Sequence, residues 1–522
     1  MRFKQFSCST ISAVGLATLT FASFARSVVA QELDATSSQP LAITQMEPEV
    51  PTDSSQEIAQ PQPEPAPCEE CEKQARKTKD ALNTAMKDAY KGVFYTNDFS
   101  YLQNPAYDGP HFAGDSIKGL MDGKLDLGGE YRSRYHHESN MRGLGLTGID
   151  DQFWLSRVRL FSNYRVTENI RVFGEYLYAD SGGEDFAPRP IEENRGEFQN
   201  LFVDATLFDC DEMQVLGRAG RQELLLGAER LVSPLDWANT RRTFDGYRAT
   251  VKGSQNAVDL FYTNPVNRIA ATGGTNEWDS SNNNQSFYGA YLSNKSLGKD
   301  YGVSALETYY IGYDNTDQNF SFHTIGSRVA GKVDSVLYEF EGGLQFGDNA
   351  DGSGHDAGFM AAGLGKVLNA DGTFGTWSPT VWAWYDWASG GDSTLIAPGD
   401  DGFHHYFPLA HKYNGFMDLF GRRNLNDVNV QFISPIGKRV NFLVWYHYFF
   451  LDQATTPYNA GNVAVSKDLG YEIDLLWTIA INPRHNMLIG YSHFNSGDYY
   501  NTPGVAFSGD ADFFYTQYQV RF

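Results

Sequence analysis

The sequence DFFYTQYQVRF, residues 512–522, closes the chain and indicates how the chain folds. Counting back from the terminal Phe522, every second residue is apolar, aromatic or small, and the residues between are mostly polar. The members of the first set are Phe514, Thr516, Tyr518 and Val520. A period of two residues predicts a strand whose two faces meet different surroundings.

The same period recurs along most of the chain. From about Lys124 there are some eighteen candidate strands, near residues 125–135, 153–164, 168–179, 197–208, 213–221, 244–252, 256–264, 285–294, 301–311, 322–331, 335–346, 356–367, 378–387, 427–434, 439–449, 469–480, 484–494 and 511–522. Each is close to the roughly 9–11 residues that a tilted strand needs to cross a bilayer. The connections alternate between short turns and long loops, which is typical of outer-membrane barrels with periplasmic turns and external loops.

These patterns predict an all-β fold, a closed antiparallel transmembrane barrel over residues 124–522. Closure is required because every backbone polar group at bilayer depth must be paired. Barrels of about sixteen to eighteen strands leave an aqueous channel. The final strand resembles the closing strand of bacterial outer-membrane barrels. That resemblance implies that the barrel-insertion machinery recognises Phe522 and that outer-membrane lipid surrounds the wall.

The first residues predict export. Arg2 and Lys4 precede an apolar run over residues 11–24, and small residues around Ala30 suit a cleavage site, so residues 1–30 are predicted to be a signal peptide. No later run approaches the roughly 18 apolar residues of a spanning helix. We therefore expect an exported chain without a helical anchor, located in the outer membrane.

Two stretches separate the signal from the barrel. Residues 31–68 are rich in Pro, Gln and Glu and predict a disordered linker. Residues 69–123 predict a short helix and a lead-in segment. Their mixed charges favour a solvated helix, and the aromatic stretch that follows leaves a plug or contact segment open. We expect the barrel to insert without residues 31–110.

The cysteines are few. Cys68 and Cys71 predict a small disulfide or an idle pair in the exported tail, and Cys210 stands apart from them. The pair lacks the following histidine of a haem-attachment motif. No cofactor is predicted.

Composition agrees with a barrel. Hydrophobic residues make up 41% of the chain and the mean hydropathy is -0.42, far too polar for a helical membrane protein. A barrel tolerates this polarity because each strand shows lipid only every second residue. The net charge of -23 argues against nucleic acid as a partner. That total leaves the local sign of the lumen open.

Arginines concentrate on one face of the early strands. Arg157 and Arg159 alternate with apolar residues in the strand 153–164, and Arg132 and Arg134 alternate with small or aromatic residues in the first strand. A Lys or Arg at the bilayer midplane on the lipid face costs roughly 2–4 kcal/mol. We therefore expect these four arginines to face the lumen.

The densest group of charges lies in residues 215–248. Its motifs resemble those of the alginate-export family of outer-membrane porins. The shared motifs are Gly220-Arg221-Gln222, Gly227-Ala228-Glu229-Arg230-Leu231, Asp236-Trp237-Ala238-Asn239 and Arg242-Thr243-Phe244-Asp245-Gly246. The first strand and the strand of Arg157 and Arg159 also look like that family.

The resemblance implies a barrel whose loops fold into a lumen lined with Arg and Lys. The residues it places on the substrate path are Arg132, Arg134, Arg157, Arg159, Arg218, Arg221, Arg230, Arg241 and Arg242. Arginine and aspartate clusters in large barrels also often brace an inward-folded loop, and the residues predicted for that role are Glu229, Asp236, Trp237, Asn239 and Asp245. Guanidinium groups meet carboxylates with a planar fork, and a series of weak contacts passes a polyanion along a channel. The predicted function is a porin that passes anionic solutes, in particular an acidic polysaccharide of alginate type.

Other functions remain open at this point. The arginine and aspartate pattern also suits a purely structural brace, and a general or carbohydrate-selective porin or a barrel adhesin would share the fold. No catalytic motif of the familiar hydrolase or nucleotide-binding types is present, so an enzyme is not predicted. No metal site is predicted either. In residues 388–426, His404, His405 and His411 suggest a divalent-cation loop, but a solvated surface loop is favoured.

Overall fold

The computed structural model describes residues 69–143, 145–268, 278–369, 372, 375, 377–391, 400–454, 466–502, 507 and 509–522. The predicted signal peptide and linker, with Cys68, lie outside these ranges. Within the described residues no helix has the length and apolar character needed to span a bilayer.

The described strands form a closed antiparallel sheet. Eighteen of them follow one another around the wall, and β1 pairs with β19 to close it. The strands are β1 (Leu125–Ser139), β2 (Asp151–Arg165), β3 (Ile170–Gly182), β4 (Asn194–Cys210), β5 (Met213–Gln222), β6 (Phe244–Gly253), β7 (Asn256–Asn267), β8 (Ser280–Ser281), β9 (Gln285–Asn294), β10 (Val303–Asn315), β11 (Phe320–Val333), β12 (Val336–Asp348), β13 (Gly354–Val367), β14 (Thr380–Ala388), β15 (Leu425–Ile436), β16 (Val440–Phe450), β17 (Asp468–Asn482), β18 (His485–Ser496) and β19 (Ala511–Arg521). The two-residue β8 pairs only with the end of β7 and is not part of the wall. The predicted barrel of about eighteen strands is confirmed, and each predicted range overlaps one wall strand.

The alternation of side chains decides which face of the wall is which. In β2, Trp154 and Leu160 are exposed on the outer face, whereas Arg157 and Arg159 are fully buried on the inner face. β1 lies beside it with Arg132 opposite Arg157. Directly opposite residues of an antiparallel pair point to the same face, so the arginines of β1 and β2 share the interior.

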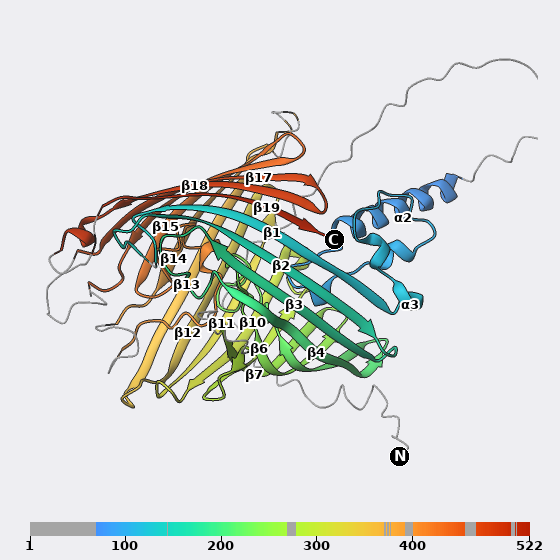
Figure 1. Ribbon diagram of the computed structural model, residues 1–522, viewed down its shortest axis with the longest axis horizontal. Coiled ribbons are helices and arrows are strands. Elements are labelled where there is room, and N and C mark those ends of the chain that lie inside the picture. The colour runs from blue at the N-terminus through green and yellow to red at the C-terminus, as the bar shows by residue number, and fades with distance from the viewer. Residues whose placement is uncertain are drawn as a thin grey trace, which may run out of the picture.

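The N-terminal helices gather at one end of the barrel. They are α2 (Glu69–Lys87), η1 (Phe94–Thr96), η2 (Ser100–Gln103), η3 (Asp115–Ile117) and α3 (Leu120–Gly123). Figure 1 shows α2 and α3 beyond the same end of the barrel as the C-terminus. Most of α2 is exposed, and burial begins with Leu82 and Met86 near its end. This end carries the short turns between strands. Three further 3-10 turns lie elsewhere, namely η4 (Lys299–Tyr301), η5 (Ala410–Lys412) and η6 (Asp498–Asn501).

Three segments fill the interior that the wall encloses. We name them the mouth segment (residues 89–103), the first inner loop (residues 223–243) and the second inner loop (residues 400–424). Each carries buried apolar side chains that pack on inward-facing residues of the wall. The two inner loops also join each other, through a parallel bridge between Val232 and Phe407. The core of this barrel is therefore made by inserted segments as well as by the wall.

Candidate functional site

The first inner loop is fixed to β1 and β2 through its own backbone. Arg132 Nη1 donates to the carbonyl of Asp236 at 2.7 Å, and Arg132 Nη2 donates to that of Ala238 at 2.6 Å. Arg157 Nη2 contacts Asp236 Oδ1 at 2.8 Å and Glu130 Oε1 at 2.7 Å. Arg132 and Arg157 of the wall thus hold residues 236–238 of the first inner loop in place.

Trp237 and Asn239 complete this attachment. The guanidinium of Arg134 lies 3.7 Å from the centre of the Trp237 ring, and its Nη1 donates to the Trp237 carbonyl at 2.8 Å. The ring of His411, from the second inner loop, also stacks on the Trp237 ring, with the two ring centres 3.6 Å apart. Asn239 Nδ2 donates to the Ser156 carbonyl of β2 at 3.0 Å.

A second group of charges lies next to the first. Arg159 Nε contacts Glu175 Oε1 of β3 at 2.6 Å. Arg241 pairs with Glu223 and with Asp236. Burial opposes the charge of Arg241, but Glu223 and then Asp236 outweigh it and raise the pKa of this guanidinium. The cluster is therefore a network of alternating charges at the foot of the first inner loop.

The structure places the remaining predicted residues elsewhere. Arg218 pairs with Asp204 at 2.7 Å on the inner face of β4 and β5. Arg230 contacts Glu341 of β12 at 2.9 Å and also pairs with Glu339, far around the wall from β1. Its neighbour Glu229 accepts a contact from Lys412 at 3.1 Å and so links the two inner loops.

Arg221 and Asp245 form a separate group with the buried Glu197, whose Oε1 lies 2.9 Å from Arg221 Nη1. Arg221 Nε contacts Asp245 Oδ1 at 2.9 Å. Arg221 lies opposite Leu201 in the sheet, and Leu201 is 47% exposed on the outer face. Because opposite residues share a face, the register gives Arg221 and Asp245 the outward side of the wall. The structure does not bring this pair together with Arg132, Arg157 and the other inner arginines.

Three of the predicted arginines have no carboxylate in direct contact. Across the described parts of the chain, no carboxylate oxygen lies within 4.0 Å of Arg132, Arg134 or Arg242. Arg242 donates only to the carbonyls of Ser233 and Pro408, at 3.2 and 3.3 Å. Burial, reinforced by Arg268, lowers the pKa of Arg242, yet a guanidinium remains charged at neutral pH.

The second inner loop corrects a prediction from the sequence. The part of residues 388–426 that is described does not form a solvated surface loop. Phe403, Met417 and Arg422 are buried, and Tyr406 Oη lies 2.7 Å from Thr324 Oγ1 on the inner face of β11. Its aromatic and apolar residues were the signal that favours an inward loop. Within the described residues, no group of three or more His, Cys, Asp or Glu side chains has the arrangement of a metal site.

Sequence reasoning also missed the partners of the arginines. Glu130, Glu175 and Glu223 are fully buried and supply the opposing charges of the cluster. Strand parity is the available signal, since Glu130 shares its face with Arg132. Cys210 is disulfide-bonded, so its predicted isolation is wrong.

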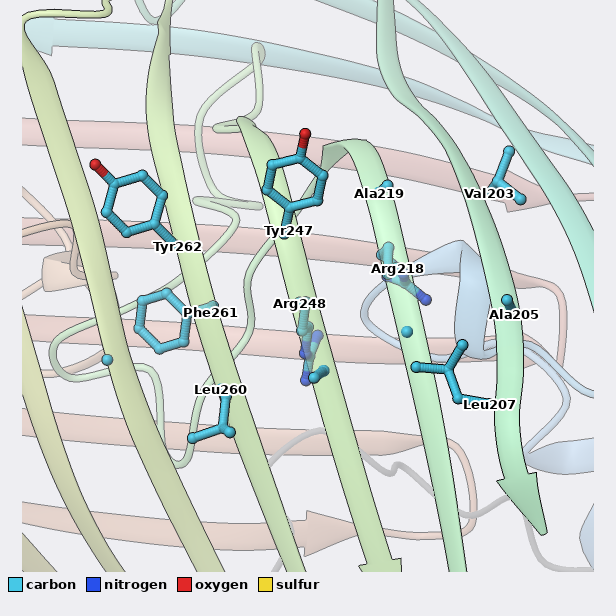
Figure 2. Close-up of a pocket in the computed structure, with 13 residues that line it drawn as sticks. Val203, Ala205, Leu207, Arg218, Ala219, Tyr247, Arg248, Leu260, Phe261 and Tyr262 are labelled. Carbon is cyan, nitrogen blue, oxygen red and sulfur yellow. The ribbon is translucent and has the colours of Figure 1, made fainter. Parts of the chain in front are cut away.

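A groove of about 560 Å³ lies on the opposite side of the wall from the inner arginines. Figure 2 shows bulky side chains standing around small ones, with Leu207, Tyr247, Leu260 and Tyr262 around Ala205 and Ala219. These bulky residues are exposed on the outer face. The residues that alternate with them along the strands, such as Arg218 and Arg248, point inward. The groove is apolar and belongs to the outer surface rather than to the interior.

Comparison with known proteins places this geometry in context. A family model described as alginate export matches residues 123–512. The solved structure of OccAB1 from Acinetobacter baumannii is similar, with a TM-score of 0.52 and 14% identity over 78% of this chain and 97% of that chain. OpdO from Pseudomonas aeruginosa gives a TM-score of 0.51 and 12% identity over 76% and 97% of the two chains. OpdK from the same organism, solved with vanillate, gives 0.50 and 11% over 76% and 98%. No curated protein matches the chain.

Proposed function

The chain belongs to the alginate-export family and is an outer-membrane channel, and from that premise we propose that it passes an anionic solute. The proposed substrate is an acidic polysaccharide of the alginate type, which carries one carboxylate per sugar. The proposed path runs along the inner face of β1 and β2, past the foot of the first inner loop.

The observation that carries this proposal is the set of uncompensated arginines. Arg132 and Arg134 of β1 and Arg242 of the first inner loop meet carbonyls, amides and rings rather than carboxylates. No contacting carboxylate neutralises them, so in this proposal their charge adds to the local field. At physiological salt the Debye length is about 8 Å, so the acidic residues of distant loops do not offset a field that acts inside the lumen.

A general porin without anion preference is the second candidate. The observation in its favour is that Arg157, Arg159, Arg218, Arg230 and Arg241 all have carboxylate partners. Paired arginines brace the inner loops without setting the sign of the lumen. Selectivity therefore depends on whether the three uncompensated arginines dominate.

The test is the reversal potential across a KCl gradient in planar bilayers, with and without oligouronates. We expect anion preference for the native channel and block by the oligouronate. Arg242→Gln should reduce both, because it removes an uncompensated inner charge. Arg221→Gln is the matched control, because it removes the same charge from the outward side of the wall and should leave selectivity unchanged.

Heat-modifiable mobility on gels would confirm that both variants are folded barrels. A native channel that prefers cations, or that ignores the oligouronate while remaining open, would support the general porin instead.

A further inference from the structure

We propose that the mouth segment is a removable stopper for the short-turn end of the channel. Seated, it closes the path; released, it exposes Arg159 and Arg218 as the first sites that an anion meets from that end. This inference concerns regulation of the path described above and rests on the proposed function.

The mouth segment lies inside the wall rather than against its rim. Phe94 and Tyr95 are buried. The Phe94 ring lies 5.2 Å from that of Phe161 in β2, and the Tyr95 ring lies 5.4 Å from that of Phe202 in β4. Phe161, Phe173 and Phe202 all face inward and form one apolar cluster with the segment. The segment therefore occupies space that an open channel leaves to water.

The segment also covers the arginines themselves. The Arg159 guanidinium lies 3.8 Å from the centre of the Phe94 ring, and that of Arg218 lies 4.1 Å from the centre of the Tyr95 ring. Ring faces attract cations through their quadrupole. They thereby take the positions from which a carboxylate would approach the same guanidinium groups.

Backbone oxygens of the segment occupy further donors. Arg171 Nη1 donates to the Tyr95 carbonyl at 2.8 Å, and Arg241 Nη2 donates to the Gly92 carbonyl at 3.1 Å. A carbonyl oxygen is the neutral counterpart of a carboxylate oxygen as an acceptor. In this way the segment satisfies four inner arginines as an anionic ligand would, but without charge.

The absence of ion pairs to the wall makes the segment removable. Among the described ion pairs, none joins residues 89–103 to the wall. Arg159 keeps Glu175, Arg171 and Arg218 keep Asp204, and Arg241 keeps Glu223 when the segment withdraws. Withdrawal therefore leaves each of these four arginines with its carboxylate, whereas breaking a buried ion pair would strand a charge.

One disulfide bears on the design of the test. Cys210, at the end of β4 beside a short turn, is disulfide-bonded. The other cysteines of the chain are Cys8, Cys68 and Cys71, and all precede the mouth segment. The test below therefore includes a thiol reductant, which breaks the disulfide of Cys210.

The test cuts the chain after the barrel has assembled, so that folding is not in question. A protease site is inserted between Pro105 and Ala106, which are both exposed. The purified full chain is cut and treated with a thiol reductant, and release of the N-terminal fragment is followed on gels. Conductance in planar bilayers is then measured in KCl alone.

We expect low conductance for the uncut protein and a several-fold increase once the fragment is cut and released. Equal conductance before and after verified release would overturn the proposal. A second route is the double variant Phe94→Ala with Tyr95→Ala, which should open the uncut channel. Its matched control is Tyr247→Ala with Tyr262→Ala, which removes two aromatic rings from the outer face.

The two hypotheses fail separately. If release opens the channel but the open channel shows no anion preference, the result supports the stopper and contradicts the anionic substrate. If the uncut channel already conducts and is anion-selective while release changes nothing, the result supports the anionic substrate and contradicts the stopper.

Discussion

The mouth segment and the first inner loop both fill the barrel, but they are held by different chemistry. The loop is bound by buried ion pairs, such as Arg230 with Glu341 at 2.9 Å. The mouth segment is bound by ring faces and carbonyls, such as Phe94 beneath Arg159. Removing one partner of a buried ion pair leaves an unpaired charge and costs roughly 3–5 kcal/mol. A ring contact leaves nothing comparable behind, so the loop is the fixed frame and the segment is the part that can move.

The largest expected effect breaks the fixed frame. Arg230→Met removes a fully buried guanidinium that lies between Glu339 and Glu341. Glu339 then keeps Arg328, but the buried Glu341 loses its ion-pair partner, and we expect a loss of about 3–5 kcal/mol in unfolding free energy. The measurement is urea unfolding followed by tryptophan fluorescence in detergent.

Arg195→Met is the control for that variant. Arg195 pairs with Asp180 but keeps 39% of its side chain exposed, and exposed ion pairs contribute only about 0–1 kcal/mol. Equal effects at Arg195 and Arg230 would contradict the view that burial of the pair makes the loop rigid.

The next effect loosens the second inner loop with acid. Burial, with Arg423 and His355 nearby, lowers the pKa of His404 to about 3, and burial and Arg422 hold the pKa of His405 well below its usual range. A base with a depressed folded pKa stabilises the fold above its unfolded pKa, near 6.5. That stability is lost as the pH falls toward the folded pKa. At pH 5.5 the two histidines together should cost roughly 2–3 kcal/mol.

Hydrogen exchange between pH 7.5 and 5.5 would measure this loss. We expect faster exchange in the second inner loop and little change in the mouth segment, which contains no histidine. His404→Phe with His405→Phe should remove most of the dependence on pH. If acid accelerates exchange more in the mouth segment than in the second inner loop, the prediction is contradicted.

A smaller effect sharpens the description of the mouth. Arg484 lies in the turn between β17 and β18, is buried, and donates to the Met86 carbonyl at 3.1 Å and to Tyr101 Oη at 2.8 Å. Arg484→Gln should weaken seating by about 1.5 kcal/mol, the lower end for hydrogen bonds to a charged group. After cleavage at the site inserted after Pro105, dissociation of the N-terminal fragment should accelerate roughly tenfold. Lys91→Gln, an exposed change on the same segment, should not alter the rate.

The smallest effect is expected at the solvated end of α2. Lys79 Nζ contacts Asp108 Oδ2 at 2.7 Å, but both side chains are more than half exposed. Solvent and salt screen such a pair, so Asp108→Asn should leave both proteolysis and conductance unchanged. A clear loss of seating would show that the segment depends on a salt bridge after all.

The wall could be predicted from the sequence because it carries a period. Alternation alone located the eighteen wall strands and gave Arg157 and Arg159 the inner face of β2. The same rule also separates Arg218 from Arg221. They lie three residues apart in β5, so a period of two puts them on opposite faces. The motif resemblance assigned both arginines to the substrate path, whereas the alternation of side chains along β5 puts them on opposite faces of the wall.

The interior could not be predicted in the same way. An inward loop obeys no period, and the sequence of the second inner loop does not say which residues of β11 or β14 its side chains meet. The aromatic residues of the mouth segment indicated a contact, but their partners, Phe161 and Phe202, lie 60 to 110 residues further along the chain. Only the closure of the wall brings these positions together.

The two ends of the chain meet at the mouth. Tyr90 Oη donates to the main-chain oxygen of Phe522 at 2.6 Å, and that oxygen also accepts from the Gly129 amide at 2.7 Å. Phe522 is the residue that the sequence predicts as the assembly signal. Seating of the segment at this oxygen therefore requires the β1–β19 seam to be complete. The contact therefore sets an order of events. The proposed stopper can seat only after β1 and β19 have paired, because an unfinished barrel lacks the backbone on which the segment docks.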